Sequence, residues 1–324
     1  MAFDLNNSKV WFREQFIDYK DAHVSIFNKT FMYGLYVFTG IRANWNAETR
    51  ELHVFRLDEH YKRFLHSCRI MRFKQFPKLY TRERFIQAVK NTLGENNIYE
   101  DIYIRPFSFI DVEAMAPTLD EDAFGIGLYP MGNYVADKGL RCNVSSYTRT
   151  EDNAISPHVK VGGAYVNTAL TKYEAVRLGY DEAIVLDAHG HAVEGSAENL
   201  FIVRDGTLIT PPVSANILEG ISRKSVIEIA KDEGIPVLER NIDRSELYKA
   251  DEVFLTGTAA RVAIVSSIDD VEVGNGQYNV SERIQSLFKE IAYGFNPKYQ
   301  DWLTTITPAS HQEGSDPLHP LSPN

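Results

Sequence analysis

The sequence is poor in the residues on which several protein classes depend. Its 324 residues include only two cysteines, Cys68 and Cys142, which cannot build a disulfide framework or a four-cysteine zinc site. No stretch approaches the ~18 uninterrupted apolar residues of a membrane-spanning helix. The first residues lack the basic and apolar regions of a signal peptide. We therefore expect a cytoplasmic protein without a membrane partner.

Positive charge is also scarce. Lys and Arg number 34 against 44 Asp and Glu, so the formal net charge is −10. A broad surface for nucleic acid is therefore not expected, although a local cationic pocket is compatible with this balance. The composition, with 44% hydrophobic, 12% aromatic and 24% charged residues, excludes a fibrous or disordered chain. The length predicts about two domains.

Familiar catalytic and metal-binding motifs are missing as well. The chain has no GxGxxG after a strand, no GxxxxGK[ST], no HExxH and no GxSxG. His158, His189 and His191 lie fairly close in sequence, but neither a cysteine nor a paired-histidine spacing accompanies them. We interpret them as ordinary loop and strand residues and expect no metal site.

Strand and helix patterns alternate along the first part of the chain. They predict a strand over 51–56, a helix capped by Asp58 and ending near Met71, a helix from about Thr81 to Gly94, and strands over 101–110 and 123–129. Pro106 lies inside one of these strands and predicts a bulge or an edge position. The stretch 130–139 combines proline, glycine and asparagine, and predicts a domain boundary.

The second part of the chain mixes the two patterns in another order. Strands are expected over 140–147, 182–187, 199–204, 252–256 and 262–266, with 182–187 and 199–204 paired as a hairpin, and helices over 164–178, 221–233 and from about 281. The order lacks the regular cadence of a doubly wound sheet, so we predict an α+β fold. Residues 307–324 are rich in proline, lack Lys and Arg, and predict a disordered tail.

The segment HVKVGGAY (158–165) contains the first candidate for chemistry. Lys160 stands between two valines on an expected strand that ends in Gly162 and Gly163. A lysine in a strand is usually a solvated side chain. Here the β-branched neighbours indicate a buried strand, where desolvation lowers the pKa of an amine and makes it a nucleophile. The two glycines would let a planar ligand approach the backbone closely.

Three further segments complete a possible site. In VEGSAENLF (193–201), Glu194 is a carboxylate among small and apolar residues, although a hairpin-turn glutamate is the commoner interpretation. LEGIS (218–222) opens a helix whose free amides, with the Ser222 hydroxyl, could hold an anion. TGTAA (256–260) is a turn that could do the same. An amine, a carboxylate and an anion cradle are the parts that a pyridoxal phosphate site requires.

The chain resembles the fold-type IV pyridoxal-phosphate enzymes, most closely the branched-chain amino acid aminotransferases. The resemblance runs from about residue 9 to residue 303. Its strongest part contains, in order, KVGGAY, GYDEAIVLD, VEGSAENLF, TPP, LEGIS and LYKADEVFLTGTAA. YGLYVFTGIR (33–42), FRLDEHYKRF (55–64) and YIRP (103–106) support it in the first half.

The resemblance implies a role for each matching residue. Lys160 would bind pyridoxal 5'-phosphate covalently and afterwards move the proton, Glu194 would pair with the pyridine nitrogen, and Tyr165 would bond to the phenolic oxygen. The phosphate would be held by Arg63, Ile221, Ser222 and Thr258. The substrate pocket would contain Tyr33, Phe38, Arg42, Tyr103, Arg105, Tyr134, Thr258 and Ala259. For the aromatic residues, ordinary packing remains open.

The resemblance also implies the architecture and the reaction. It predicts a small α/β N-terminal domain (1–132), a linker (133–139), a larger β-barrel-like cofactor domain (140–306) and a homodimer. The expected reaction moves an amino group from hydrophobic, branched-chain L-amino acids to 2-oxoglutarate. Because glutamate has a second carboxylate, we expect Arg42 or Arg105 to bind that group with its guanidinium.

Alternatives remain open at this point. Thr39, Met131 and Arg261 replace the Glu, Trp and Glu that are usual in the family pattern, and the first two bear on the pocket wall. An amine transaminase, a D-amino acid transaminase or an aminodeoxychorismate lyase of the same fold is therefore possible. A non-catalytic ligand-binding protein is the alternative from another class, and the intact Lys160, Tyr165 and Glu194 argue against it.

Overall fold

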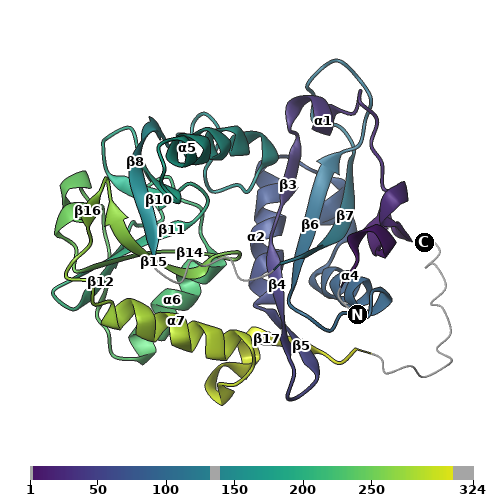
Figure 1. Ribbon diagram of the computed structural model, residues 1–324. Helices are drawn as coiled ribbons and strands as arrows, with labels where there is room; N and C mark the ends of the chain where they lie inside the picture. The colour runs from purple at the N-terminus through teal and green to yellow at the C-terminus, as the bar shows by residue number, and fades with distance from the viewer. Residues whose placement is uncertain (1–2, 132–138, 309–324) are drawn as a thin grey trace.

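A computed structural model describes residues 3–131 and 139–308, and two β-sheets lie side by side in it, each with its own helices (Figure 1). The expected linker (133–139) and tail (307–324) therefore lie almost wholly outside the described residues. The domain limits stay a prediction. Among the described residues no helix is long and apolar enough to cross a membrane.

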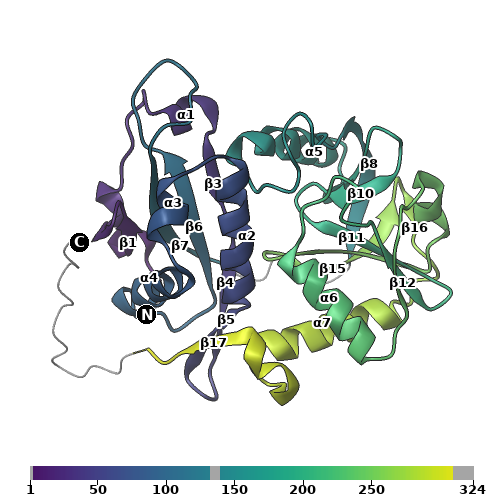
Figure 2. The same ribbon diagram turned by 180° about the vertical axis from the view of Figure 1, so that it is seen from behind.

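The first sheet is antiparallel and is built mainly from the N-terminal half. Its order is β17 (Leu303–Ile306), β5 (Glu51–Phe55), β4 (Ile41–Asn46), β6 (Ile102–Ile110), β7 (Asp122–Pro130), β1 (Lys9–Phe12) and β2 (Gln15–Asp18), and β3 (Tyr36–Phe38) pairs with β6. The helices α2 (Leu57–Ile70), α3 (Gln75–Leu79) and α4 (Arg82–Glu95) cover one face (Figure 2). The short α1 (Lys29–Tyr33) precedes β3. Since β17 pairs with β5, the chain returns to the first sheet at its end.

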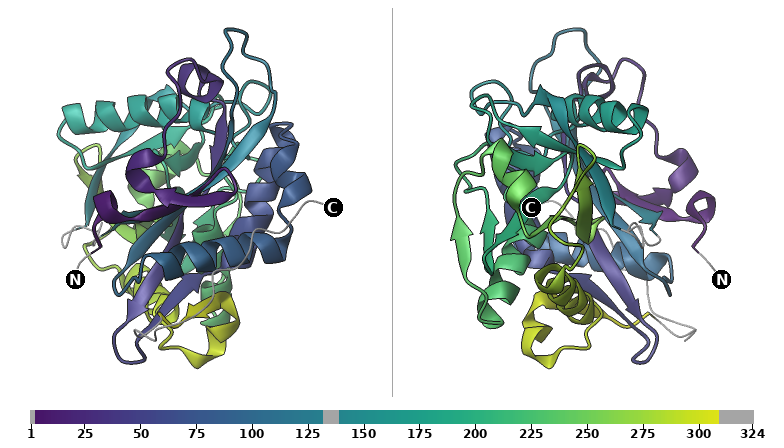
Figure 3. Two further views of the ribbon diagram at one scale, coloured as in Figure 1. Left: turned by 90° about the vertical axis from the view of Figure 1, so that its right-hand side faces the viewer. Right: turned by 60° about the vertical axis from the view of Figure 1, so that its left-hand side comes forward.

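The second sheet closes on itself. Its order is β10 (Ala192–Gly195), β9 (Glu182–Leu186), β8 (Leu140–Thr148), β15 (Arg261–Ile268), β14 (Glu252–Gly257), β11 (Asn199–Arg204), β12 (Thr207–Thr210) and β13 (Val237–Glu239), with β16 (Val271–Glu272) beside β15. A further pairing of β10 with β11 closes the ring, which confirms the barrel-like domain. The helices α5 (Tyr165–Arg177), α6 (Ile221–Asp232) and α7 (Asn279–Ala292) pack outside it (Figure 3).

Two predicted strand arrangements are wrong. The expected hairpin of 182–187 with 199–204 does not form, because β10 lies between β9 and β11 and pairs with both. Pro106 is not at an edge, because β6 has neighbours on both sides. The Pro106 carbonyl accepts from the Thr39 amide at 3.0 Å, so the proline nitrogen, which has no hydrogen, also faces residues 39–40 between β3 and β4. The proline therefore removes no ladder hydrogen bond.

Helix ends also differ in detail from the predictions. α4 begins directly after Thr81 as expected, and the Thr81 side chain caps it by accepting from the Arg84 amide. Gly94 is not the stop, because α4 continues to Glu95. Asp58 is not the cap of α2: Arg56 holds that position, and Asp58 forms ion pairs with Lys62 and Arg82 instead.

Candidate active site

A cavity of about 180 Å³ lies where the two sheets face each other. The first sheet and α2 contribute Phe38, Gly40, Arg63, Tyr103 and Arg105, and the barrel side contributes Lys160, Tyr165, Ile221, Ser222, Thr258 and Ala259. Most of the residues expected in the site therefore meet at one place, although more than half of the chain separates the first of them from the last.

Lys160 is held between the two halves of the molecule. It lies outside the named strands, just before an isolated bridge of Val161 with Val37, so the expected strand is wrong at this point. Its carbonyl accepts from the Phe38 amide at 3.0 Å, and its amide donates to the Ser67 hydroxyl at 3.4 Å. Val159 and Val161 are buried in the core of the first sheet. The burial of these two valines therefore fixes the backbone of Lys160.

The Lys160 amine has the protonation properties of a nucleophile. It donates to the Tyr165 hydroxyl at 2.5 Å and lies 5.1 Å from the centre of the Phe38 ring. Burial lowers its pKa to about 7, and the positive charges of Arg63 and Arg105 act in the same direction. Burial likewise raises the pKa of Tyr165, so this phenol stays protonated at neutral pH.

The glycine pair after Lys160 serves the protein's own packing. A Cβ on Gly162 would lie 1.9 Å from the Tyr36 ring, so no side chain fits there. The Gly163 amide donates to the Gly34 carbonyl at 3.1 Å. The close approach of the first sheet thus explains Gly162 without a planar ligand, whereas a Cβ on Gly163 would meet its nearest atom at an ordinary 3.6 Å.

Glu194 is buried in β10 and its carboxylate is held from three sides. Oε1 accepts from the Asn199 side chain and from the Leu218 amide, each at 2.9 Å. Oε2 forms an ion pair with Arg149 at 2.8 Å. Burial raises the pKa of Glu194, and Arg149 opposes that shift. The same donors orient the group beside Lys160 and Tyr165.

The opposite end of the cavity is suited to an anion. The first turn of α6 starts at Gly220, which makes no side-chain cap, so its amide groups remain available beside Ile221 and Ser222. Arg63 lies half-buried at the same place and forms no ion pair within the described part of the chain. Burial lowers the pKa of Arg63 to about 10, which leaves it charged at neutral pH. Thr258 completes this end.

An apolar wall with one cation forms the rest of the cavity. The Phe38 and Tyr165 rings meet edge to face at 4.9 Å. The Arg105 guanidinium lies 4.3 Å from the centre of the Phe38 ring and 5.1 Å from that of Tyr103. Arg105 also lacks an ion pair with any described residue. A ligand carboxylate and an aliphatic side chain could both be accommodated here.

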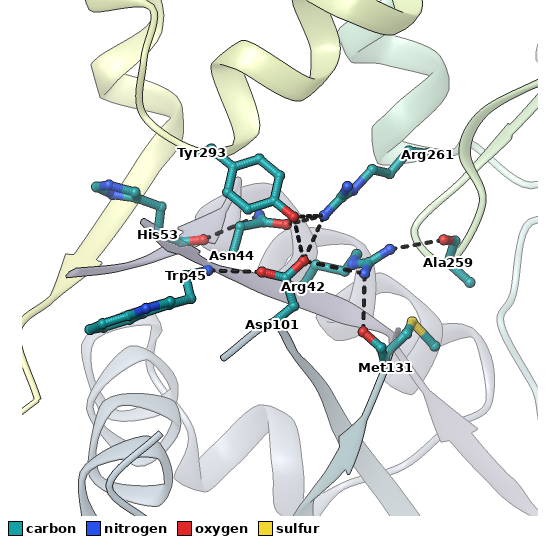
Figure 4. Close-up of polar contacts among 9 residues, drawn as sticks. All are labelled: Arg42, Asn44, Trp45, His53, Asp101, Met131, Ala259, Arg261 and Tyr293. Atoms are coloured by element: carbon teal, nitrogen blue, oxygen red, sulfur yellow. Dashed lines mark hydrogen bonds and ion pairs between the residues drawn. The ribbon is translucent and has the colours of Figure 1, made fainter. Parts of the chain in front are cut away.

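Two predicted pocket residues, Tyr33 and Arg42, are not among the residues that line this cavity. The Tyr33 hydroxyl donates to the Met115 carbonyl elsewhere on the molecule. Arg42 points behind the cavity, where its guanidinium donates to the carbonyls of Ala259 and Met131 (Figure 4). Tyr134 lies outside the described residues. Of the two candidate arginines for the second carboxylate, the described cavity contains only Arg105.

Thr39 also differs from its expected place in the pocket wall. It is fully buried, and its hydroxyl contacts His60 at 3.1 Å and accepts from Arg63 at 3.1 Å. Its side chain therefore positions Arg63 and does not face the cavity.

Two polar residues of the site could not be singled out from the sequence. Asn199 lies within the VEGSAENLF motif, five residues after Glu194, and only the pairing of β10 with β11 shows that it bonds to the carboxylate. Arg149 stands 45 residues before Glu194 and carries no motif signal. Its ion pair depends on β9, which pairs with both β8 and β10 and so brings the end of β8 beside Glu194.

The residues of this cavity fit pyridoxal 5'-phosphate. An amine of lowered pKa, a buried carboxylate and a phenol occupy one end. Open helix amides and an arginine without a carboxylate partner occupy the other. These are the groups needed for an aldehyde, a protonated pyridine nitrogen, a phenolic oxygen and a phosphate, respectively.

Comparison with known proteins gives consistent results. The profile of the family described as amino-transferase class IV matches residues 36–268. A protein of Aquifex aeolicus, named a probable branched-chain-amino-acid aminotransferase, is 42% identical over 91% of this chain and 96% of its own.

Solved structures of similar proteins cover almost the same length. The branched-chain aminotransferase of Thermoproteus uzoniensis with norvaline has a TM-score of 0.87 at 40% identity, covering 92% of this chain and 99% of that one. The branched-chain amino acid aminotransferase of Thermobaculum terrenum, in its PLP-form (holo-form), has a TM-score of 0.86 at 31% identity, over 93% of this chain and 99% of that one.

Proposed function

The chain belongs to the class IV aminotransferases, which use pyridoxal 5'-phosphate, and we propose that it moves the amino group of branched-chain L-amino acids to 2-oxoglutarate. The family membership confirms the resemblance that the motifs indicate. The observation that carries the substrate proposal is the position of Arg105, a cation without an ion pair among the described residues, against an apolar wall. Such a pocket accepts an aliphatic side chain in one half of the reaction and a second carboxylate in the other.

We assign the cofactor contacts from the geometry of the cavity. Lys160 is the residue that binds the cofactor covalently, Tyr165 bonds to its phenolic oxygen, and Glu194 pairs with its pyridine nitrogen. Arg63, the amides of Ile221 and Ser222, the Ser222 hydroxyl and Thr258 hold its phosphate. When bound, the cofactor supplies the aldehyde that accepts the amino group and a ring that takes up electron density.

The protein groups control protons around that chemistry. With the cofactor bound, Glu194 would keep a proton on its pyridine nitrogen, because three donors hold the carboxylate in place and Arg149 favours its charged form. The Lys160 amine, with a pKa of about 7, both takes and returns a proton near neutral pH. The Phe38 ring, whose centre lies 5.1 Å from this amine, shields one side of it.

An assay of amino donors tests the substrate proposal. Leucine, isoleucine and valine with 2-oxoglutarate should give turnover that exceeds that with a chiral aryl amine or a D-amino acid, and Lys160→Ala should abolish it. Faster transfer from the aryl amine or from a D-amino acid would show that the donor class is wrong. Borohydride reduction of the holoenzyme should fix the cofactor to Lys160, and fixation to another lysine would refute that assignment.

We further propose that the protein is a cytoplasmic homodimer. Val166, Leu170 and Tyr173 follow one another on a single face of α5, and their side chains are 65%, 41% and 68% exposed. Phe31 on α1 is 68% exposed, and both helices lie at the upper edge of the molecule in Figure 1. An apolar helix face of this kind is suited to a second copy of the chain. The free, buried Cys68 and Cys142 fit a reducing compartment.

A further inference from the structure

A polar cluster crosses between the two sheets directly behind the turn of residues 258–260. Its centre is Asp101, which precedes β6 and receives hydrogen bonds from the Tyr293 hydroxyl at 2.5 Å and from Arg261 at 3.0 Å (Figure 4). Arg42 forms a longer ion pair with the same oxygen at 3.7 Å. The Trp45 amide donates to the other carboxylate oxygen at 3.0 Å.

Arg42 is the member of this cluster that reaches the active-site wall. Nη1 donates to the Ala259 carbonyl at 3.0 Å, and Nη2 donates to the Met131 carbonyl at 3.4 Å. Ala259 belongs to the barrel domain and lines the cavity, whereas Met131 follows β7 of the first sheet. One guanidinium thus fastens a turn of the barrel to the first sheet.

The register of the first sheet links this contact to the pocket. Arg42 on β4 lies opposite Tyr103 on β6, and Tyr103 lines the cavity. The distance between the 258–260 turn and the Tyr103–Arg105 wall therefore depends on where the Arg42 side chain is held.

Holding Arg42 in place requires Asp101. Arg42 is 4% exposed, and Arg261 lies close enough for the two positive charges to repel each other. Asp101 is the carboxylate that pairs with both. Arg261 is fixed in turn by the Asn44 side chain at 2.8 Å and by the Tyr293 hydroxyl at 2.9 Å. Two neighbouring arginines, one buried and one largely buried, would be unfavourable without that carboxylate.

We propose that Arg42 is a positioning residue that sets the width of the substrate cavity, and that Asp101, with Arg261 and Tyr293, holds Arg42 in that place. The inference builds on the proposed transamination but assigns Arg42 no contact with substrate. It therefore replaces the expected role of Arg42 as a carboxylate-binding residue.

Binding of 4-methylpentanoate tests the proposal without turnover, because this acid is leucine without its amino group. The variant is Arg42→Lys, whose single ammonium group cannot span both carbonyls. The matched control is Arg56→Lys: Arg56 is another buried arginine between the two halves, bonding to Ser225 and Glu228 on α6. Calorimetry on each holoenzyme gives Kd, and thermal unfolding gives the midpoint.

Both variants should lower the unfolding midpoint, but only Arg42→Lys should raise the Kd, by about tenfold, as expected for the loss of one buried charge-assisted hydrogen bond. An unchanged Kd in Arg42→Lys, or an equal rise in Arg56→Lys, would overturn the proposal. A holoenzyme that binds the acid with this pattern yet fails to transaminate leucine would refute the proposed function alone.

Kinetics separate positioning from direct contact. In Arg42→Lys, the KM values for 2-oxoglutarate and for 4-methyl-2-oxopentanoate should rise by the same factor. A rise confined to 2-oxoglutarate would mean that Arg42 touches the second carboxylate, and the positioning role would be lost.

A double-mutant cycle tests the support from Asp101. Asp101→Asn and Arg261→Gln should each raise the Kd for 4-methylpentanoate, and the double variant should raise it no further than the larger single effect. Fully additive effects would show that the two residues act separately and would overturn this half of the proposal. Arg261→Gln removes one of the two repelling charges, so it also keeps the proposal testable if Arg42→Lys does not fold.

Discussion

The protonation of Lys160 determines when the protein can react with its cofactor. Its pKa of about 7 lies far below the ordinary value of 10.5 because the amine is buried and faces two arginines. Only the neutral amine attacks an aldehyde, and the amine is neutral above its pKa. The rate of pyridoxal phosphate uptake by the apoprotein should therefore rise with pH through about 7 and level off above it. Stopped-flow absorbance at a series of pH values measures this rate.

The pH dependence of cofactor uptake in the Arg105→Gln variant is the comparison for the wild-type curve. Removing a neighbouring positive charge favours the protonated amine, so the pKa of Lys160 rises and the midpoint moves to higher pH. A wild-type midpoint close to 10.5 would show that the amine is not desolvated.

Glu194 gives a second prediction at the level of single residues. Glu194→Gln keeps the shape of the side chain but removes the charge that holds a proton on the pyridine nitrogen. We expect kcat to fall at least about a hundredfold at saturating cofactor, within the usual range for acid–base groups. Steady-state kinetics with leucine measure the change.

Glu252→Gln is the matched control for Glu194. Glu252 is another buried carboxylate of the barrel, and it accepts from Ser281 at the start of α7, away from the cavity. The Glu252→Gln variant should have a lower unfolding midpoint, while its kcat remains close to that of the wild type. Equal kcat values in the two variants would contradict the role of Glu194.

At the level of elements, the contact between β3 and the segment after Lys160 depends on one glycine of the pair. A Cβ on Gly162 would lie 1.9 Å from the Tyr36 ring, whereas a Cβ on Gly163 would meet its nearest atom at an ordinary 3.6 Å. Gly162→Ala should therefore lower the unfolding midpoint and the cofactor occupancy, and Gly163→Ala should change both much less. Tyr36→Ala should restore part of the loss in Gly162→Ala. Similar behaviour of the two alanine variants would contradict this explanation.

The sequence predicted most helices and strands because their signals are local. α4 begins after Thr81 as the pattern indicates, and the barrel strands β9, β11 and β14 follow short runs of buried apolar residues. The errors in strand arrangement occurred where pairing is non-local. The insertion of β10 between β9 and β11, and the neighbours of Pro106, depend on strands that are distant in sequence.

For the whole molecule, the exposed face of α5 predicts association. Replacing Tyr173 by Glu puts a charge into the apolar stripe, and burial of that charge in a dimer would be costly. Tyr173→Glu should therefore convert dimer to monomer in sedimentation velocity. Leu238→Glu is the control, since Leu238 is 46% exposed on β13, away from α5. A wild-type monomer, or a Tyr173→Glu dimer as stable as the wild type, would contradict the proposed interface.

The sequence by itself determined the chemical parts of this protein. Lys160, Glu194 and the turns at 220–222 and 256–260 carry local patterns, because a buried amine, a carboxylate among apolar residues and a helix start are each visible in a few residues. The order of these segments also indicated the family, and with it the α+β fold and the cofactor.

Only the tertiary structure decided which residues complete those parts. Arg149 meets Glu194 because β9 pairs with both β8 and β10, Ser67 and Phe38 hold Lys160 because α2 and β3 pack against it, and Arg42 leaves the pocket for the carbonyl of Ala259. Each of these contacts joins segments that are far apart in the chain. Their geometry follows from how two sheets pack together, which no local pattern specifies.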